Sequence, residues 1–465
     1  MIRDAQGLEV TTDSPEAIAA IDRFVDQILS YSNNPEVIFK GVEADPTSVI
    51  VNAYAATLHM LSETADAPTQ AAPYLKRAYE HLNQANEREQ LYLHGINAWV
   101  NGDIDQAIAY HEEIANRFPR DLLSVQMGQH HYLNLGNKQG LLQIAEKVLP
   151  ANRENHYIYG MLAFGLGENQ RFQEAEAAGR KATEINRRDP WTHHAIAHVL
   201  YSQGRLDEGI AWTESVCDVW EDSGLYTHHW WHTALYYVDK EDFRKVLELY
   251  DTRIWGTDAN KQTSLDLINA ISLLMRLELA GVDVDNSHPD NSAVNPAYSG
   301  NASRWEEIAN SVTGRIHEHI LSFYDLHYIY ALARVGQDEL VDQMLKSIQA
   351  YAQMTKPCVQ KAWSEVTVPA AQGMVAYARG EWATAARLLE LVLPRLHETG
   401  GSDAQRDLFE QIYLDCLIRT KEDNQARQLL EKRAAARDNI PSTQRELARI
   451  YNKLGLTESC LESVI

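Results

Sequence analysis

The residues best suited to chemistry gather in residues 190–238, PWTHHAIAHVLYSQGRLDEGIAWTESVCDVWEDSGLYTHHWWHTALYYV. This stretch holds six of the chain's 18 histidines and five of its 10 tryptophans. Buried imidazole and indole groups need polar partners, so the stretch indicates an active site, a ligand groove or a polar core. His194 and His198 stand four residues apart, which places them on one face of a helix.

Three kinds of chemistry fit this pair. As zinc ligands, His194 and His198 need at least a third protein ligand, for which His228 and His232 are candidates. As a general acid or base, a histidine with an ordinary pKa transfers protons near neutral pH. As ligand contacts or hydrogen-bonded core residues, they need no catalytic partner. No recognisable nucleophile stands beside them, so the sequence favours the third interpretation and predicts no metal or other cofactor, with zinc as a less favoured alternative.

Small residues recur at the spacing of a helical repeat. Ala163 and Ala197 are 34 residues apart, and so are Leu414 and Ala448. The tetratricopeptide unit is about 34 residues long and consists of two antiparallel helices. One unit cannot bury its apolar face alone, so neighbouring units stack into a continuous core. The sequence therefore predicts an all-α, tetratricopeptide-like (TPR-like) right-handed superhelix, or α-solenoid.

The predicted solenoid is continuous and has four parts. Residues 1–85 form an N-terminal helical cap, and residues 86–280 carry TPR-like repeats. Residues 281–304 form a long surface loop, because they are rich in Asn, Ser, Asp, Gly and Pro and lack a helical period. Residues 305–465 carry further repeats and a C-terminal cap. Within this last part, Ser402 and Gln405 have the spacing of a capping box, which predicts that a helix begins there.

The repeat register predicts which side chains face the concave surface. Counting from the small residues Ala197 and Ala234 places histidine and tryptophan of two neighbouring units on that surface. The side chains concerned are His194, His198, Tyr201, His228 and Trp231. A pocket needs apolar walls with a few convergent polar groups, so we expect these residues to form one wall of a ligand groove.

A second wall is expected near Asp325 and His327, at the start of a predicted helix. Asp325 could accept a hydrogen bond from a groove histidine and set its tautomer, or it could simply stabilise the helix N-terminus. Arg406 lies in a dense charged turn that favours an ion-pair network over a ligand clamp, but we include it among the ligand-binding residues. If the groove is catalytic, the acid–base candidates are His194, His198, His232, Asp325 and His327.

Several blocks go beyond a general repeat signature. They are HAIAHVL (194–200), HHWWHTAL (228–235), LDLINAISLLMRLELAGVDV (265–284), YDLHYIYAL (324–332) and GGSDAQRDLFEQ (400–411). In these blocks the chain resembles the tetratricopeptide repeat protein 38 family. The resemblance implies an all-helical superhelix over most of residues 90–420 and carries no activity with it.

Charge and hydropathy bear on the partners. The net charge is −23, with a sequence pI near 5.2. The electrostatic field of such a negatively charged protein repels the phosphate groups of nucleic acids and anionic membranes. We therefore expect no nucleic acid and no membrane as a partner, and the lack of a secretory signal predicts a cytoplasmic protein. The predicted function is to bind a small molecule or peptide in the His/Trp-rich groove. The alternative is an enzyme using the groove histidines for acid–base or metal-assisted chemistry. Oligomeric state is left open.

Overall fold

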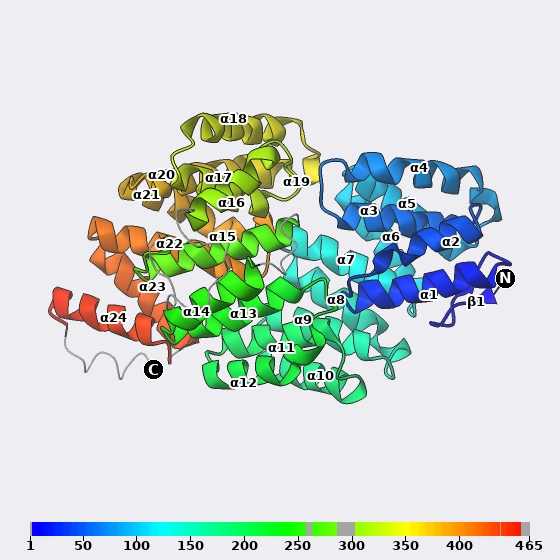
Figure 1. The fold of residues 1–465 in the computed structure, drawn as a ribbon, viewed down its shortest axis with the longest axis horizontal. Helices are drawn as coiled ribbons and strands as arrows, with labels where there is room; N and C mark the ends of the chain where they lie inside the picture. The colour runs from blue at the N-terminus through cyan, green and yellow to red at the C-terminus, as the bar shows by residue number, and fades with distance from the viewer. Residues whose placement is uncertain (1, 257–262, 286–302, 438, 457–465) are drawn as a thin grey trace. The chain divides into compact units, whose positions relative to one another are not determined.

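The computed structural model describes residues 2–256, 263–285, 303–437 and 439–456 (Figure 1). Almost all regular structure in these ranges is helical. The described part has one sheet, in which β1 (Ile2–Arg3) pairs antiparallel with β2 (Glu9–Val10), Ile2 opposite Val10. The predicted all-α, TPR-like fold is confirmed. No helix within the described ranges is long and apolar enough to cross a membrane.

The chain divides into two compact units. Unit 1 contains residues 1–196, 218–225 and 356–359, and unit 2 contains residues 197–217, 226–355 and 360–465. The chain passes from one unit to the other within helix α11 (Pro190–Ser202), within a 3₁₀ turn (Cys217–Val219) and within helix α19 (Pro357–Ala362). Each unit is described by itself below.

Unit 1 begins with the two short strands and continues as consecutive helices joined by short turns. The helices are α1 (Pro15–Leu29), α2 (Ile38–Ala44), α3 (Val49–Leu61), α4 (Ala67–Glu80), α5 (Glu87–Val100), α6 (Ile104–Arg117), α7 (Leu122–Asn134), α8 (Lys138–Val148), α9 (His156–Glu168), α10 (Phe172–Ile185) and the first part of α11, with 3₁₀ turns at Pro35–Val37, Leu82–Gln84 and Leu149–Ala151. Successive helices pack as pairs, for example α5 with α6 and α9 with α10. Helices therefore fill the region predicted as a cap, whereas its role as a cap stays a prediction.

Unit 2 continues with the end of α11. Its further helices are α12 (Leu206–Val216), α13 (Tyr226–Asp239), α14 (Phe243–Leu249), α15 (Ser264–Leu279), α16 (Arg304–Val312), α17 (Ser322–Arg334), α18 (Asp338–Met354), α20 (Val368–Ala378), α21 (Trp382–Val392), α22 (Asp403–Thr420), α23 (Asp423–Ala436) and α24 (Pro441–Leu454), with π-helical turns at Tyr250–Ile254 and Trp363–Thr367 and 3₁₀ turns at Thr313–Arg315 and Leu393–Thr399. The predicted loop at 281–304 lies between α15 and α16, and most of it, residues 286–302, falls outside the described ranges.

Local sequence accounts for the helix ends and turns. The capping box predicted at the start of α22 is confirmed: the Ser402 side chain accepts from the backbone of Gln405, and the Gln405 side chain accepts from the backbone of Ser402. Between α11 and α12, Gly204 has φ of +66°, a conformation that an L side chain rarely adopts. Short turns of this kind let consecutive helices fold back on one another.

Helix α15 occupies the core of unit 2. Every residue from Leu267 to Leu277 is buried. A helix that is buried all round has neighbours on every side, and α15 contacts α13, α17 and α22 (Figure 1). The polar residues of α15 are therefore held against side chains from several helices, which matters for the site.

Candidate metal centre

Three histidines of unit 2 converge from two helices. His228 and His232 lie four residues apart on α13 and share one helix face, and His198 comes from α11. The ring centroids of His198 and His232 are 4.4 Å apart, and those of His228 and His232 are 4.7 Å apart. Each of the three rings offers a nitrogen within 4.8 Å of the others, and all three residues are buried. The group can therefore converge on one small ion.

A contact between α13 and the end of α11 sets this geometry. Tyr236, one turn after His232, donates its hydroxyl hydrogen to the backbone carbonyl of Ala197 across 2.7 Å. Gly209 on α12 makes room for the Tyr236 ring, because a Cβ at that position would overlap the ring. Small residues at the helix contacts thus bring His232 against His198.

The neighbouring helix α15 orients His228. The Oδ1 atom of Asn269 can only accept, so His228 donates its Nδ1 hydrogen to it across 3.0 Å. This contact fixes the tautomer of His228 in which Nε2 carries the lone pair. A histidine ligand usually has its other nitrogen fixed by such a partner. Sequence reasoning missed Asn269, although a polar residue in the apolar run LDLINAISLL was a visible signal.

Trp231 joins the histidines to the rest of the core. Its ring stacks on His228, with centroids 5.2 Å apart and an interplanar angle of 9°. Its Nε1 hydrogen is donated to the Ser272 hydroxyl across 2.8 Å. The guanidinium carbon of Arg276 lies 5.4 Å from the ring centroid, in cation–π range.

Burial keeps His198 and His228 neutral. It lowers the pKa of His198 to about 3, with His228 adding to the decrease and Asp403 opposing it. Burial also lowers the pKa of His228 to about 4, and the hydrogen bond that His228 donates to Asn269 opposes this decrease. Neutral imidazole is the form that binds metal. In a tetrahedral zinc site with Zn–N bonds of about 2.0–2.1 Å, the nitrogens are about 3.4 Å apart, so small side-chain rotations would suffice for the group to close on the ion.

The other residues predicted for the first wall are also buried. Tyr201 lies one turn after His198, packs against Tyr236 and has the guanidinium of Arg437 4.1 Å from its ring centroid. Burial raises the pKa of Tyr201 to about 12. His194, four residues before His198 on α11, contacts the rings of Phe164 and Trp191 at centroid distances of 5.6 and 4.9 Å. A groove lined by these side chains stays a prediction.

Asp325 has a histidine partner that the sequence did not single out. Its Oδ2 accepts from Nδ1 of His319 across 2.6 Å, and His319 also contacts the Ser347 hydroxyl at 2.7 Å. Asp325 thus orients His319, a residue outside the predicted groove set. Burial raises the pKa of Asp325, opposed by His319.

His327 and Arg406, also expected on the second wall, have local partners. His327 donates its Nδ1 hydrogen to the carbonyl of Phe323 across 2.8 Å, and burial lowers its pKa to about 4. Arg406 donates to Asp403 across 2.7 Å and to the carbonyl of Gly400 across 3.1 Å. These contacts match the ion-pair interpretation of Arg406, while its contact with a ligand stays a prediction.

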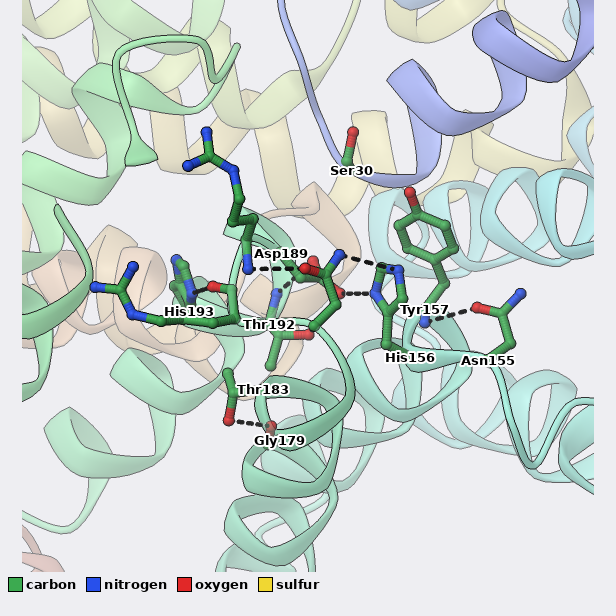
Figure 2. Close-up of polar contacts among 12 residues, drawn as sticks. Ser30, Asn155, His156, Tyr157, Gly179, Thr183, Asp189, Thr192 and His193 are labelled. Atoms are coloured by element: carbon green, nitrogen blue, oxygen red, sulfur yellow. Dashed lines mark hydrogen bonds and ion pairs between the residues drawn. The ribbon is translucent and has the colours of Figure 1, made fainter. Parts of the chain in front are cut away.

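Unit 1 contains a separate polar network around the start of α11 (Figure 2). The buried carboxylate of Asp189 accepts from Nδ1 of His156 across 2.8 Å and from the Thr192 hydroxyl across 2.9 Å. It also accepts from the backbone N–H of Thr192, and the Asn186 amide lies 3.2 Å from Nε2 of His156. Both nitrogens of His156 are therefore engaged, and the network caps α11.

A polar cleft of about 420 Å³ lies in the same unit. Its lining includes Asp26, Tyr157, Arg188 and Asp222, and the Tyr157 hydroxyl donates to Asp26 across 2.6 Å. Sequence reasoning did not select these residues, because they come from separate segments of the chain without a common motif.

Comparison with known proteins agrees with the fold. No protein-family model matches the chain. Human IFIT1, solved as a dimer with m7Gppp-AAAA, is 14% identical, with 97% of this chain and 98% of that chain covered and a TM-score of 0.42. The Cut9–Hcn1 hetero-tetramer of APC/C is 11% identical, with 94% and 91% covered and a TM-score of 0.37. The chain has a TPR-like helical-repeat fold. MamA from Desulfovibrio magneticus RS-1 is 18% identical but covers 36% of this chain and 94% of its own, with a TM-score of 0.28.

The general exclusion of nucleic acid as a partner was wrong. Human IFIT1, a helical-repeat protein, was solved with the capped oligonucleotide m7Gppp-AAAA. The prediction rested on a net charge of −23. A net charge sums over the whole surface, whereas binding depends on the local field, so an acidic chain can still hold an anionic partner.

Proposed function

We propose that this TPR-like protein binds a divalent transition-metal ion, Zn²⁺ in the first place, through His198, His228 and His232 of unit 2. One observation carries the proposal: three buried ring nitrogens from α11 and α13 lie within 4.8 Å of one another. Imidazole suits Zn²⁺, and burial lowers the pKa of His198 and His228, which keeps these two rings in the neutral form that binds metal. The sequence alone favoured a cofactor-free site because no recognisable nucleophile stands beside His194 and His198, although His228 and His232 were candidates for a third ligand.

The fourth coordination position distinguishes two versions of the proposal. A fourth protein ligand would close the site, as in structural zinc centres, whereas the three histidines alone would leave a position for an exogenous ligand. A three-histidine zinc site lowers the pKa of its bound water to about 7, which would supply a nucleophile for hydrolysis. Asn269 would serve either version by fixing the tautomer of His228.

The ligand, the location and the family that the sequence predicts are also part of this proposal. We propose that the small-molecule or peptide ligand of the chain binds beside the metal ion, in a cytoplasmic protein. We also propose membership of the tetratricopeptide repeat protein 38 family. In support, two of the blocks that carry the resemblance, HAIAHVL and HHWWHTAL, contain the three proposed ligands: His198, His228 and His232.

Metal analysis of the purified protein tests the proposal. Wild-type protein loaded with Zn²⁺ and desalted should retain about one zinc per chain, and His228→Gln and His232→Gln should lose it. His111→Gln is the matched control, because His111 is a fully buried histidine of unit 1. Circular dichroism confirms that each variant is helical. Wild-type protein that retains no zinc would refute the proposal.

A further inference from the structure

A buried polar stripe runs along α15 beside the histidines. Asn269, Ser272 and Arg276 recur at three- and four-residue spacing on one face of the helix, where they meet His228 and Trp231 of α13. Asn269 and Arg276 are only 1% and 2% exposed. Such a stripe costs free energy on folding unless every polar group finds a partner.

Arg276 differs from the other deeply buried arginines. Arg88 and Arg304 each pair with a buried carboxylate at 2.8 Å, Asp121 and Asp251 respectively. Arg276 instead donates to two backbone carbonyls, those of Ser272 at 3.4 Å and Ala404 at 2.9 Å. A carbonyl accepts a hydrogen bond but does not neutralise a charge, and no carboxylate of the described residues pairs directly with the Arg276 guanidinium.

The nearest acidic groups are already engaged. Asp407 and Asp239 act on Arg276 from a distance, but they pair with Arg433 and Arg437. Burial lowers the pKa of Arg276, because it costs free energy to remove the charged guanidinium from water. Arginine nevertheless stays protonated in proteins.

Two donors on this stripe lack an acceptor. The Nε hydrogen of Arg276 and the Nδ2 amide of Asn269 have no hydrogen-bond partner among the described residues. Leaving buried donors unsatisfied is expensive. Water could accept their hydrogen bonds but would not balance the charge. An anion with acceptor oxygens would supply both the hydrogen-bond acceptors and the balancing charge.

We propose that Arg276 and Asn269 bind a small carboxylate-bearing ligand beside the histidine centre. The inference deepens the proposed function. Only the position of the ligand, next to a bound metal ion, rests on that function. Nε and a terminal nitrogen of a guanidinium match the two oxygens of a carboxylate. One uncompensated guanidinium balances a single negative charge, which favours a carboxylate over a dianionic phosphate. Trp231, between His228 and Arg276 in this chain of contacts, forms the apolar wall of the site.

Thermal unfolding with acetate as the probe tests the inference. Wild type, Arg276→Met and the control Arg304→Met are compared in sodium acetate, phosphate and chloride of matched ionic strength. Acetate should raise the unfolding midpoint of wild type and Arg304→Met by several degrees above chloride and leave Arg276→Met unchanged. In chloride, Arg276→Met should unfold no lower than wild type, because it removes a buried unpaired charge, whereas Arg304→Met should unfold lower by leaving Asp251 unpaired.

Three results would overturn the inference. Acetate could stabilise Arg276→Met as much as wild type, or phosphate could raise the unfolding midpoint of wild type more than acetate does. In chloride, the unfolding midpoint of Arg276→Met could fall as far below that of wild type as the midpoint of Arg304→Met does. Running wild type both zinc-loaded and chelator-treated, with zinc measured in each sample, separates this failure from that of the proposed function. If the protein binds zinc but acetate has no effect, only the carboxylate site is refuted. If acetate stabilises protein that never retains zinc, only the metal centre is refuted.

Discussion

Asn269 accepts the Nδ1 hydrogen of His228 across 3.0 Å, and this single contact determines which nitrogen of His228 faces the histidine cluster. The ring can then present its Nε2 lone pair without first changing tautomer. The relationship links α15, a core helix of unit 2, to the candidate ligands on α13, so the site depends on packing as much as on its own residues.

Removing that contact should weaken metal binding. Asn269→Ala is expected to reduce zinc affinity about 10–100-fold, as loss of a ligand-orienting partner typically does. Competition with a chromogenic chelator measures the affinity. Asn52→Ala is the control, because Asn52 is equally buried but donates to backbone carbonyls of Pro46 and Ser48 in unit 1. Unchanged affinity in Asn269→Ala would show that His228 is not oriented in this way.

Metal removal should destabilise the chain. An ion that binds the folded state and not the unfolded state raises stability through mass action, so chelator treatment should lower the unfolding midpoint of wild type. Differential scanning calorimetry before and after treatment measures the shift. His228→Gln should show no shift. A chelator effect of equal size in this variant would place the relevant metal elsewhere.

The contact between Gly209 and Tyr236 should be sensitive to a single methyl group. In Gly209→Ala the new Cβ would overlap the Tyr236 ring, and overpacking of this kind costs about 1–3 kcal/mol. Since Tyr236 holds α13 to the carbonyl of Ala197, zinc affinity should fall as well. Gly314→Ala is the matched control in unit 2, because a Cβ there meets nothing within 4 Å. Urea denaturation and chelator competition measure the two effects; equal stability of both variants would contradict the packing argument.

Unit 1 should lose stability in mild acid. Burial lowers the pKa of His111 to about 3 and that of His130 to about 4, below the ordinary 6.5. At pH values between these lowered pKa values and 6.5, the unfolded chain therefore binds more protons than the folded chain. Stability is fully present above pH 6.5 and is lost as pH falls toward 4, with His111 contributing a loss of about 2 kcal/mol at pH 5. Urea denaturation at pH 7 and pH 5 should show a smaller loss for His111→Gln than for wild type; parallel losses would contradict the assignment.

The buried pair of Arg88 and Asp121 should be costly to break on one side. Arg88→Met leaves the Asp121 carboxylate buried without its 2.8 Å partner and is expected to cost about 3–5 kcal/mol. The double variant Arg88→Met/Asp121→Leu should lose less, although it also removes the hydrogen bond that Asp121 accepts from the backbone of Ser124 at the start of α7. Urea denaturation of both variants checks this order. A double variant less stable than Arg88→Met would reverse the interpretation.

Much of the architecture could be predicted from local pattern. The 34-residue spacing of small residues predicts paired helices, and the spacing of Ser402 and Gln405 predicts a helix start that the structure has at Asp403. The register also selected His198, His228 and Trp231: His198 on α11 lies against His232 of α13, and α13, which carries His228 and Trp231, contacts α15. By contrast, Asp325 was expected to serve a groove histidine, and its partner is His319, six residues earlier in a non-helical segment.

The sequence by itself determined where helices begin and end and which residues share a helix face, because helix periodicity and capping act over a few residues. Only the tertiary structure decided that His198 meets His228 and His232, that Asn269 orients His228, and that the buried Arg276 pairs with no carboxylate of the described ranges. These relationships join residues some 30 to 130 positions apart, and they depend on how whole helices pack. A local pattern carries no information about such distances, since the same periodicity is compatible with many packings. The His/Trp-rich stretch that the sequence selected is thus one side of a site whose other side is α15.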